Sequence, residues 1–148
     1  MKKMNVLCLV FILVSVLSAC NKTAITAEEF TSKATSLGFT VVDITEQYEG
    51  KTIAALIAID STKSYQIEFY EVANQSLASG MFSQNSEILN QIGSGTSTSA
   101  SGSNWAFLSK TAGGAYGYAS YINTTFVYAR EPEEYKEAIK NVMKELGY

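Results

Sequence analysis

The sequence predicts an α+β fold, in which helices cover one face of an antiparallel sheet of about six strands, in the order α-βββ-α-βββ-α. Strand-like runs rich in β-branched and aromatic residues are separated by turn residues. In 64–72, for example, Tyr65, Ile67 and Phe69 alternate with polar residues. Three other segments place apolar residues at helical spacing, and the short connections between strands favour antiparallel pairing.

Each predicted helix has a recognisable start. Thr26 and Glu29 form a capping-box pattern, which predicts a helix ending before residue 38. Asn74 is a suitable N-cap for a second helix, which continues to residue 92. Pro132 is placed as the first residue of a third helix, which runs to the end of the sequence.

The predicted strands form two groups of three. Gly113 and Gly114 predict a tight turn in the second group, and Asn123-Thr124 predicts another. The strand ranges are 39–45, 52–60, 64–72, 105–110, 115–122 and 125–130.

Residues 93–104 are almost entirely glycine, serine and threonine. They contain no apolar side chain larger than alanine, so we expect a mobile loop that links the two groups of strands. Whether this loop has a function is left open by the sequence.

The N-terminal segment has the three parts of an export signal: two lysines, an apolar run over 6–17 and small residues. The run is shorter than the roughly 20 residues that a membrane-spanning helix needs. Its ending, Leu17-Ser18-Ala19-Cys20, resembles the lipobox of bacterial lipoproteins.

This resemblance implies removal of the signal peptide 1–19 and attachment of diacylglycerol to the thiol of Cys20. Residues 20–25 are then a lipidated tether, and 26–148 form a single domain. The protein is expected outside the cytoplasm, bound to the cell membrane through its lipid. A Gram-positive host is favoured, and the outer membrane is the expected site in a Gram-negative one. Cys8 leaves with the signal, so the mature domain has no disulfide.

Composition excludes several classes of function. The chain has no histidine, which removes Ser-His-Asp catalysis and the usual zinc sites. Without the two signal lysines, nine basic residues face fourteen acidic ones, a net charge of −5. Nucleic acid is therefore not an expected partner. We expect no cofactor, no metal and no catalytic residue; Asp43, Glu46 and Glu49 surround a turn, but their spacing matches no calcium loop.

Trp105, Tyr116 and Tyr118 are the candidate ligand or partner surface. Tyr116 and Tyr118 share one face of a predicted strand, where aromatic rings can stack on sugars or contact a protein. The alternative interpretation is ordinary strand packing, with each hydroxyl reaching water. If the rings form a binding surface, replacing both tyrosines should weaken binding with little loss of stability.

The mature domain resembles small uncharacterised lipoproteins of Gram-positive bacteria through Ile67-Glu68-Phe69-Tyr70 and the ending Leu146-Gly147-Tyr148, among other short segments. No activity is implied by that resemblance. We expect a non-catalytic binding or interaction module with an envelope protein or glycan as partner. The alternatives are a carboxylate-dependent enzyme acting on envelope glycans, and an inhibitory or structural lipoprotein.

Overall fold

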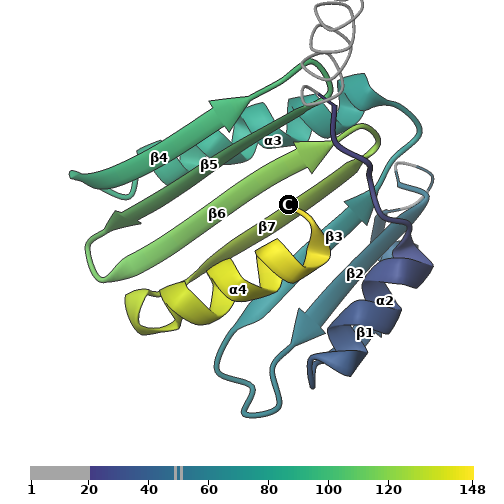
Figure 1. Ribbon diagram of the computed structural model, residues 1–148, viewed down its shortest axis with the longest axis horizontal. Coiled ribbons are helices and arrows are strands. Elements are labelled where there is room, and N and C mark those ends of the chain that lie inside the picture. Colours follow the sequence, from purple (N-terminus) through teal and green to yellow (C-terminus); the bar gives the residue numbers. More distant parts are fainter. Residues whose placement is uncertain (1–20, 49, 51) are drawn as a thin grey trace, which may run out of the picture.

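The computed structural model describes residues 21–148, except Glu49 and Lys51, and has the predicted α+β fold (Figure 1). The predicted signal peptide 1–19 and Cys20 lie outside the described residues. No helix of the described part is both long and apolar enough to cross a membrane. The elements are α2 (Ala27–Ser36), β1 (Thr40–Asp43), the 3-10 helix η2 (Thr45–Tyr48), β2 (Ala54–Ile59), β3 (Gln66–Glu71), α3 (Gln75–Asn90), β4 (Gly95–Ser101), β5 (Trp105–Ala112), β6 (Ala115–Ile122), β7 (Thr125–Pro132), the 3-10 helix η3 (Glu133–Tyr135) and α4 (Lys136–Leu146).

The strands form one antiparallel sheet in the order β1-β2-β3-β7-β6-β5-β4. Two meanders, β1 to β3 and β4 to β7, are joined where β3 pairs with β7. In this central pairing, Phe69 lies opposite Val127 and Glu71 lies opposite Thr125. The pairing brings together segments that α3 separates in the sequence, so both meanders contribute to the core on each face of the sheet.

The helix starts follow the sequence signals in two cases out of three. The Thr26 hydroxyl and the Glu29 carboxylate accept the hydrogen bonds of a capping box at the start of α2. The Asn74 side chain accepts a hydrogen bond from the Leu77 amide at the start of α3. The prediction for Pro132 was wrong: this residue ends β7, and η3 precedes α4. Its φ of −53° suits both a strand end and a helix start, so the residue type did not decide between them.

Helices α2 and α4 lie on one face of the sheet (Figure 1). The rings of Phe30 in α2 and Phe69 in β3 stack with their centroids 4.6 Å apart. From α4, Ile139 and Met143 are buried against the same core. The clean apolar stripe of the last helix therefore meets the sheet, as its spacing indicates.

Helix α3 lies on the opposite face, which differs from the predicted arrangement with all helices on one face (Figure 1). The reason lies in strand β6, whose side chains are buried on both faces of the sheet. A helix is therefore needed on each face to cover them. Tyr116 and Tyr118 face α4, whereas Gly117 and Ala119 face α3. These small residues let Leu89 of α3 approach the sheet closely, and Leu89 is fully buried.

Residues 95–101 form strand β4, so the prediction of a mobile loop over 93–104 was wrong for these residues. Each residue of β4 has a partner in β5, from Gly95 opposite Ala112 to Ser101 opposite Ala106. All seven residues of β4 are exposed. An edge strand with both faces in water needs no apolar pattern, because main-chain hydrogen bonds to its neighbour hold it in place.

Candidate binding groove

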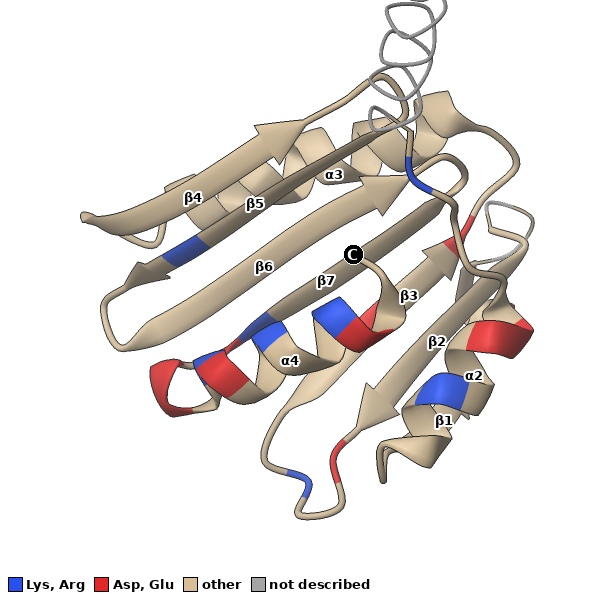
Figure 2. Ribbon diagram, viewed as in Figure 1, with Lys and Arg blue, Asp and Glu red and all other residues tan. Residues whose placement is uncertain are grey.

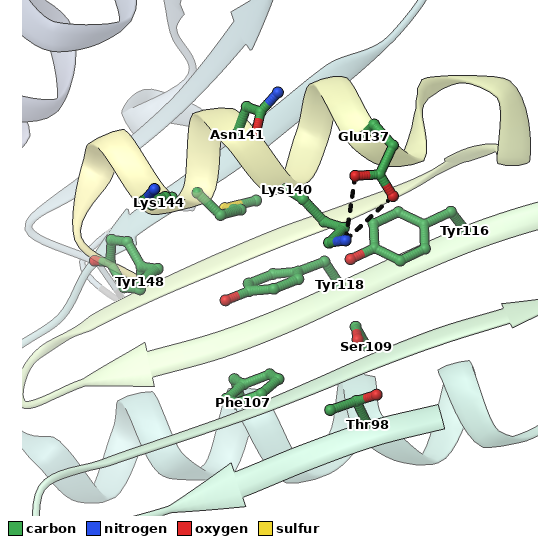
Figure 3. A pocket seen from close by; sticks show the side chains of 11 residues that line it. Thr98, Phe107, Ser109, Tyr116, Tyr118, Glu137, Lys140, Asn141, Lys144 and Tyr148 are labelled. Carbon is green, nitrogen blue, oxygen red and sulfur yellow. Dashed lines mark hydrogen bonds and ion pairs between the residues drawn. The ribbon is translucent and has the colours of Figure 1, made fainter. Parts of the chain in front are cut away.

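A groove opens between α4 and strands β4, β5 and β6, on the α4 side of the sheet (Figure 3). In Figure 1 the described helices leave β4 and the adjoining part of β5 uncovered on this side. The hollow has a volume of about 480 Å³, which is within the usual range for small-ligand sites. Aromatic side chains from the sheet form its floor, and polar side chains from α4 form its wall (Figure 3).

The floor consists of Phe107, Tyr116 and Tyr118. The two tyrosines lie two residues apart in β6 and therefore point to the same side, as predicted. The ring of Phe107 in β5 is parallel to that of Tyr118, with 6.0 Å between centroids. Phe107 is half-buried, so it is the ring of the floor most open to a bound molecule.

Tyr116 and Tyr118 are only 2% and 7% exposed and belong to the main core. The expectation that replacing both would cost little stability was therefore wrong, because truncation of buried rings leaves cavities. Burial raises the pKa of Tyr116, a hydrogen bond with Ser109 opposes this effect, and the charge of Glu137 adds to it. Burial also raises the pKa of Tyr118. Both side chains are thus neutral hydroxyls at physiological pH.

The wall of the groove is basic. Lys136, Lys140 and Lys144 are spaced four residues apart along α4, which places them on one side of the helix. The Lys136 ammonium lies 5.9 Å from the centroid of the Tyr116 ring. Lys140 and Lys144 both line the groove, where Lys140 pairs with Glu137 at 3.1 Å (Figure 3). The exposed ion pair contributes little to stability, so a ligand anion can compete for Lys140 at small cost.

Trp105 does not line this groove. It begins β5, opposite Ile122, and its half-buried ring lies under the Lys22 ammonium at 4.7 Å from the ring centroid. Partial burial lowers the pKa of Lys22. The structure thus brings together two of the three predicted surface residues, Tyr116 and Tyr118, and assigns Trp105 to a separate contact with the N-terminal segment.

Carboxylates are sparse around the groove. Among the residues that line it, Glu137 is the only acid. Asp43 and Glu46 lie together at a different hollow beside η2, and Glu49 is outside the described residues. Across residues 21–148, without 49 and 51, no three His, Cys, Asp or Glu side chains are placed to hold a metal ion.

Sequence reasoning missed Phe107, Lys140 and Lys144. The lysine spacing was visible in the sequence, along one border of the apolar stripe of the last helix. What the sequence did not reveal was that this side of α4 borders an uncovered part of the sheet.

No protein-family model matches the chain, and no curated protein matches it. Among solved structures, the crystal structure of a GTP binding regulator from Thermotoga maritima has a similar fold, with a TM-score of 0.50. The alignment covers 83% of this chain and 88% of that chain, at 12% sequence identity. At this identity the similarity concerns the fold alone.

Proposed function

We propose that the protein is a membrane-anchored extracytoplasmic lipoprotein whose domain binds an anionic ligand, or an acidic segment of an envelope partner, without catalysing a reaction. The lipobox-like sequence ending at Cys20 supports the anchor. The groove beside α4 supports the binding role.

One observation carries the binding proposal: an aromatic floor and a lysine wall meet in a single hollow. The half-buried Phe107 ring offers an apolar surface, while Lys140 and Lys144 offer ammonium groups. The mature chain is acidic overall, so basic side chains gathered at a hollow are a local exception. This combination suits a ligand with an apolar or planar part and a carboxylate or phosphate.

Two further features favour binding over hydrolysis. Glycan hydrolysis by a carboxylate pair requires two acids roughly 5–10 Å apart. Among the described residues that line the groove, Glu137 is the only acid, and Lys140 already pairs with it.

The GTP in the name of the structural neighbour is not extended to this chain. Gly50-Lys51-Thr52 has the last three residues of a phosphate-binding loop pattern, but Thr45 occupies the position of the first glycine. The segment also leads into strand β2, whereas that pattern requires a helix.

The test compares two lysines that occupy equivalent helix positions. Lys144 is in the last turn of α4 and Lys33 is in the last turn of α2, so Lys144→Gln and Lys33→Gln each remove a favourable charge at a helix end. Lys33→Gln also removes the hydrogen bond from the Lys33 ammonium to the Glu145 carbonyl, so the stability of both variants is measured beside their affinity. The full chain is produced in a bacterial host, and molecules that co-purify with it are identified by native mass spectrometry. Their affinities for both variants are then measured by calorimetry.

We expect Lys144→Gln to weaken binding by about 1 kcal/mol, or roughly fivefold in Kd, because one charge-assisted contact is lost. Lys33→Gln should bind like the wild type. Equal affinity of both variants would place the ligand elsewhere. Turnover of an envelope substrate by the purified protein would contradict the non-catalytic role.

A further inference from the structure

The segment that leads to Cys20 is fixed to the domain by hydrogen bonds. The Asn104 side chain accepts a hydrogen bond from the Lys22 amide at 3.1 Å and donates one to the Lys22 carbonyl at 2.7 Å. The Ser103 hydroxyl donates to the side-chain oxygen of Asn21. Both main-chain polar groups of Lys22 are therefore held by the turn between β4 and β5.

The same turn is tied to neighbouring parts of the fold. The Asn104 side chain donates to Asn123 in the turn between β6 and β7 at 3.0 Å. The Gln75 side chain at the start of α3 donates to the Ser103 carbonyl at 3.2 Å. These elements form one corner of the domain, which we call the tether corner: residues 21–22, 74–77, 102–105 and 123–124.

The distance from the tether corner to a lipid on Cys20 is short. Cys20 directly precedes Asn21, and consecutive Cα atoms are about 3.8 Å apart. If diacylglycerol is attached to Cys20, the membrane surface must lie within a residue or two of Asn21. A long flexible linker, which would let the domain rotate freely, is absent between Cys20 and the residues that Asn104 holds.

From this geometry we infer that the tether corner lies against the lipid headgroups and fixes the orientation of the domain on the membrane; the inference rests on the lipid anchor of the proposed function. The occupant of this surface is the headgroup layer of the bilayer that holds the lipid on Cys20, because the Asn104 hydrogen bonds fix Lys22 two residues from that lipid. The tether corner contains Lys22 and no Asp or Glu, and Glu71 lies beside it, opposite Thr125. Its partly exposed Trp105 is the residue type most typical of a membrane interface.

The opposite end of the sheet carries charges of both signs. Strand register places the turn between β2 and β3 and the end of β7 at the far end from Trp105. Asp60, Glu131, Glu133 and Glu134 lie there together with Lys63, Arg130 and Lys136, and Figure 2 shows red and blue segments around the start of α4 but tan ribbon in the turns after β4 and β6. Since these charges largely cancel, the orientation follows from the fixed position of Lys22 next to Cys20 and not from attraction of one end to anionic lipids.

The test uses the only tryptophan of the chain as a reporter. Full-length lipidated protein is reconstituted into vesicles of phosphatidylcholine and phosphatidylglycerol that contain lipids with a quencher near the headgroup. We expect quenching to reduce the emission of Trp105 roughly twofold or more, since the ring lies at the interface. A matched variant, Trp105→Phe with Tyr135→Trp, moves the reporter to η3 at the opposite end of the sheet and should show little quenching.

The hydrogen bonds are tested by Asn104→Ala, which releases Lys22 while leaving Cys20 unchanged. In this variant the quenching of Trp105 should fall toward that of the η3 reporter. Circular dichroism of each variant verifies the fold. If Trp105 is quenched in Asn104→Ala as strongly as in the wild type, and the fold is intact, the hydrogen bonds do not orient the domain.

Failure of the inference and failure of the anchor are distinguishable. Mass spectrometry of the protein shows whether Cys20 carries lipid, and co-sedimentation with vesicles shows whether the protein is bound. Lipidated, bound protein with equal quenching of the two reporters would refute the fixed orientation and leave the anchor intact. Absence of lipid on Cys20 would refute both.

Discussion

Gly117→Ala tests how closely α3 packs against the sheet. A Cβ atom at position 117 would lie 2.2 Å from a terminal methyl carbon of Leu89, far inside van der Waals contact. Leu89 is fully buried, so its side chain has no solvent-filled space into which it can turn. The added methyl group must therefore displace α3 or force Leu89 into a strained conformation.

The expected cost follows from two opposing terms. Overpacking of a well-filled core costs about 1–3 kcal/mol. The backbone of Gly117 is not at a positive φ, so alanine also gains about 0.4–1 kcal/mol through lower entropy of the unfolded chain. We expect a net loss of about 1–2 kcal/mol in the free energy of unfolding, measured by urea denaturation.

Gly80→Ala is the matched control. Gly80 lies inside α3, and a Cβ atom there would meet nothing within 4 Å. This substitution should stabilise the protein by roughly 0.5–1 kcal/mol, because glycine is a poor helix former. In the double variant Leu89→Ala with Gly117→Ala, the combined loss should be smaller than the sum of the single losses by about 1 kcal/mol or more. A neutral or stabilising Gly117→Ala would show that α3 does not pack on this face as described.

Three further predictions concern a buried lysine, a turn and the anchor. Lys110→Met should cost about 1–2 kcal/mol and speed amide exchange at the end of α3, because the buried Lys110 ammonium donates to the Asn90 carbonyl at 2.8 Å. The pKa of Asp60 is about 2: desolvation acts to raise it, but hydrogen bonds from Thr62, Ser64 and Tyr65 outweigh that effect. Since the folded pKa is below the ordinary 3.8, this stabilisation is present above about pH 4 and is lost as pH falls through 2, and Asp60→Asn should flatten the acid limb of a plot of stability against pH. Cys20→Ala should release the protein from the membrane fraction or leave it as precursor, which fractionation and mass spectrometry measure; normal processing and retention would refute the lipobox.

Local signals in the sequence predicted most of the local structure. The capping box at Thr26 formed because its donors and acceptors are within four residues of one another. The turn at Gly113 and Gly114 formed because both residues take a positive φ, which glycine adopts at little cost. These features depend on neighbours in the chain and not on the rest of the fold.

The errors concern properties that the fold decides. Strand β4 has no apolar pattern, because its stability comes from the backbone of β5 and not from its own side chains. The face on which α3 packs depends on which side of β6 has room, and that is the side where Gly117 faces Leu89. For the site, strand periodicity correctly placed Tyr116 and Tyr118 on one face, but the contribution of Lys144 depends on how α4 docks.

One end of the groove, at Phe107, lies close to the tether corner, and this limits what the groove can encounter. Phe107 is two residues beyond Trp105 in β5, about 7 Å along the strand. If Trp105 lies at the headgroups, Phe107 lies about one Debye length from the membrane surface at physiological ionic strength. Anionic lipids then act on the groove lysines as competitors for an anionic ligand. To bind in preference to anionic headgroups, a ligand must make contacts that a headgroup cannot make. The aromatic floor beside Lys140 and Lys144 provides such contacts.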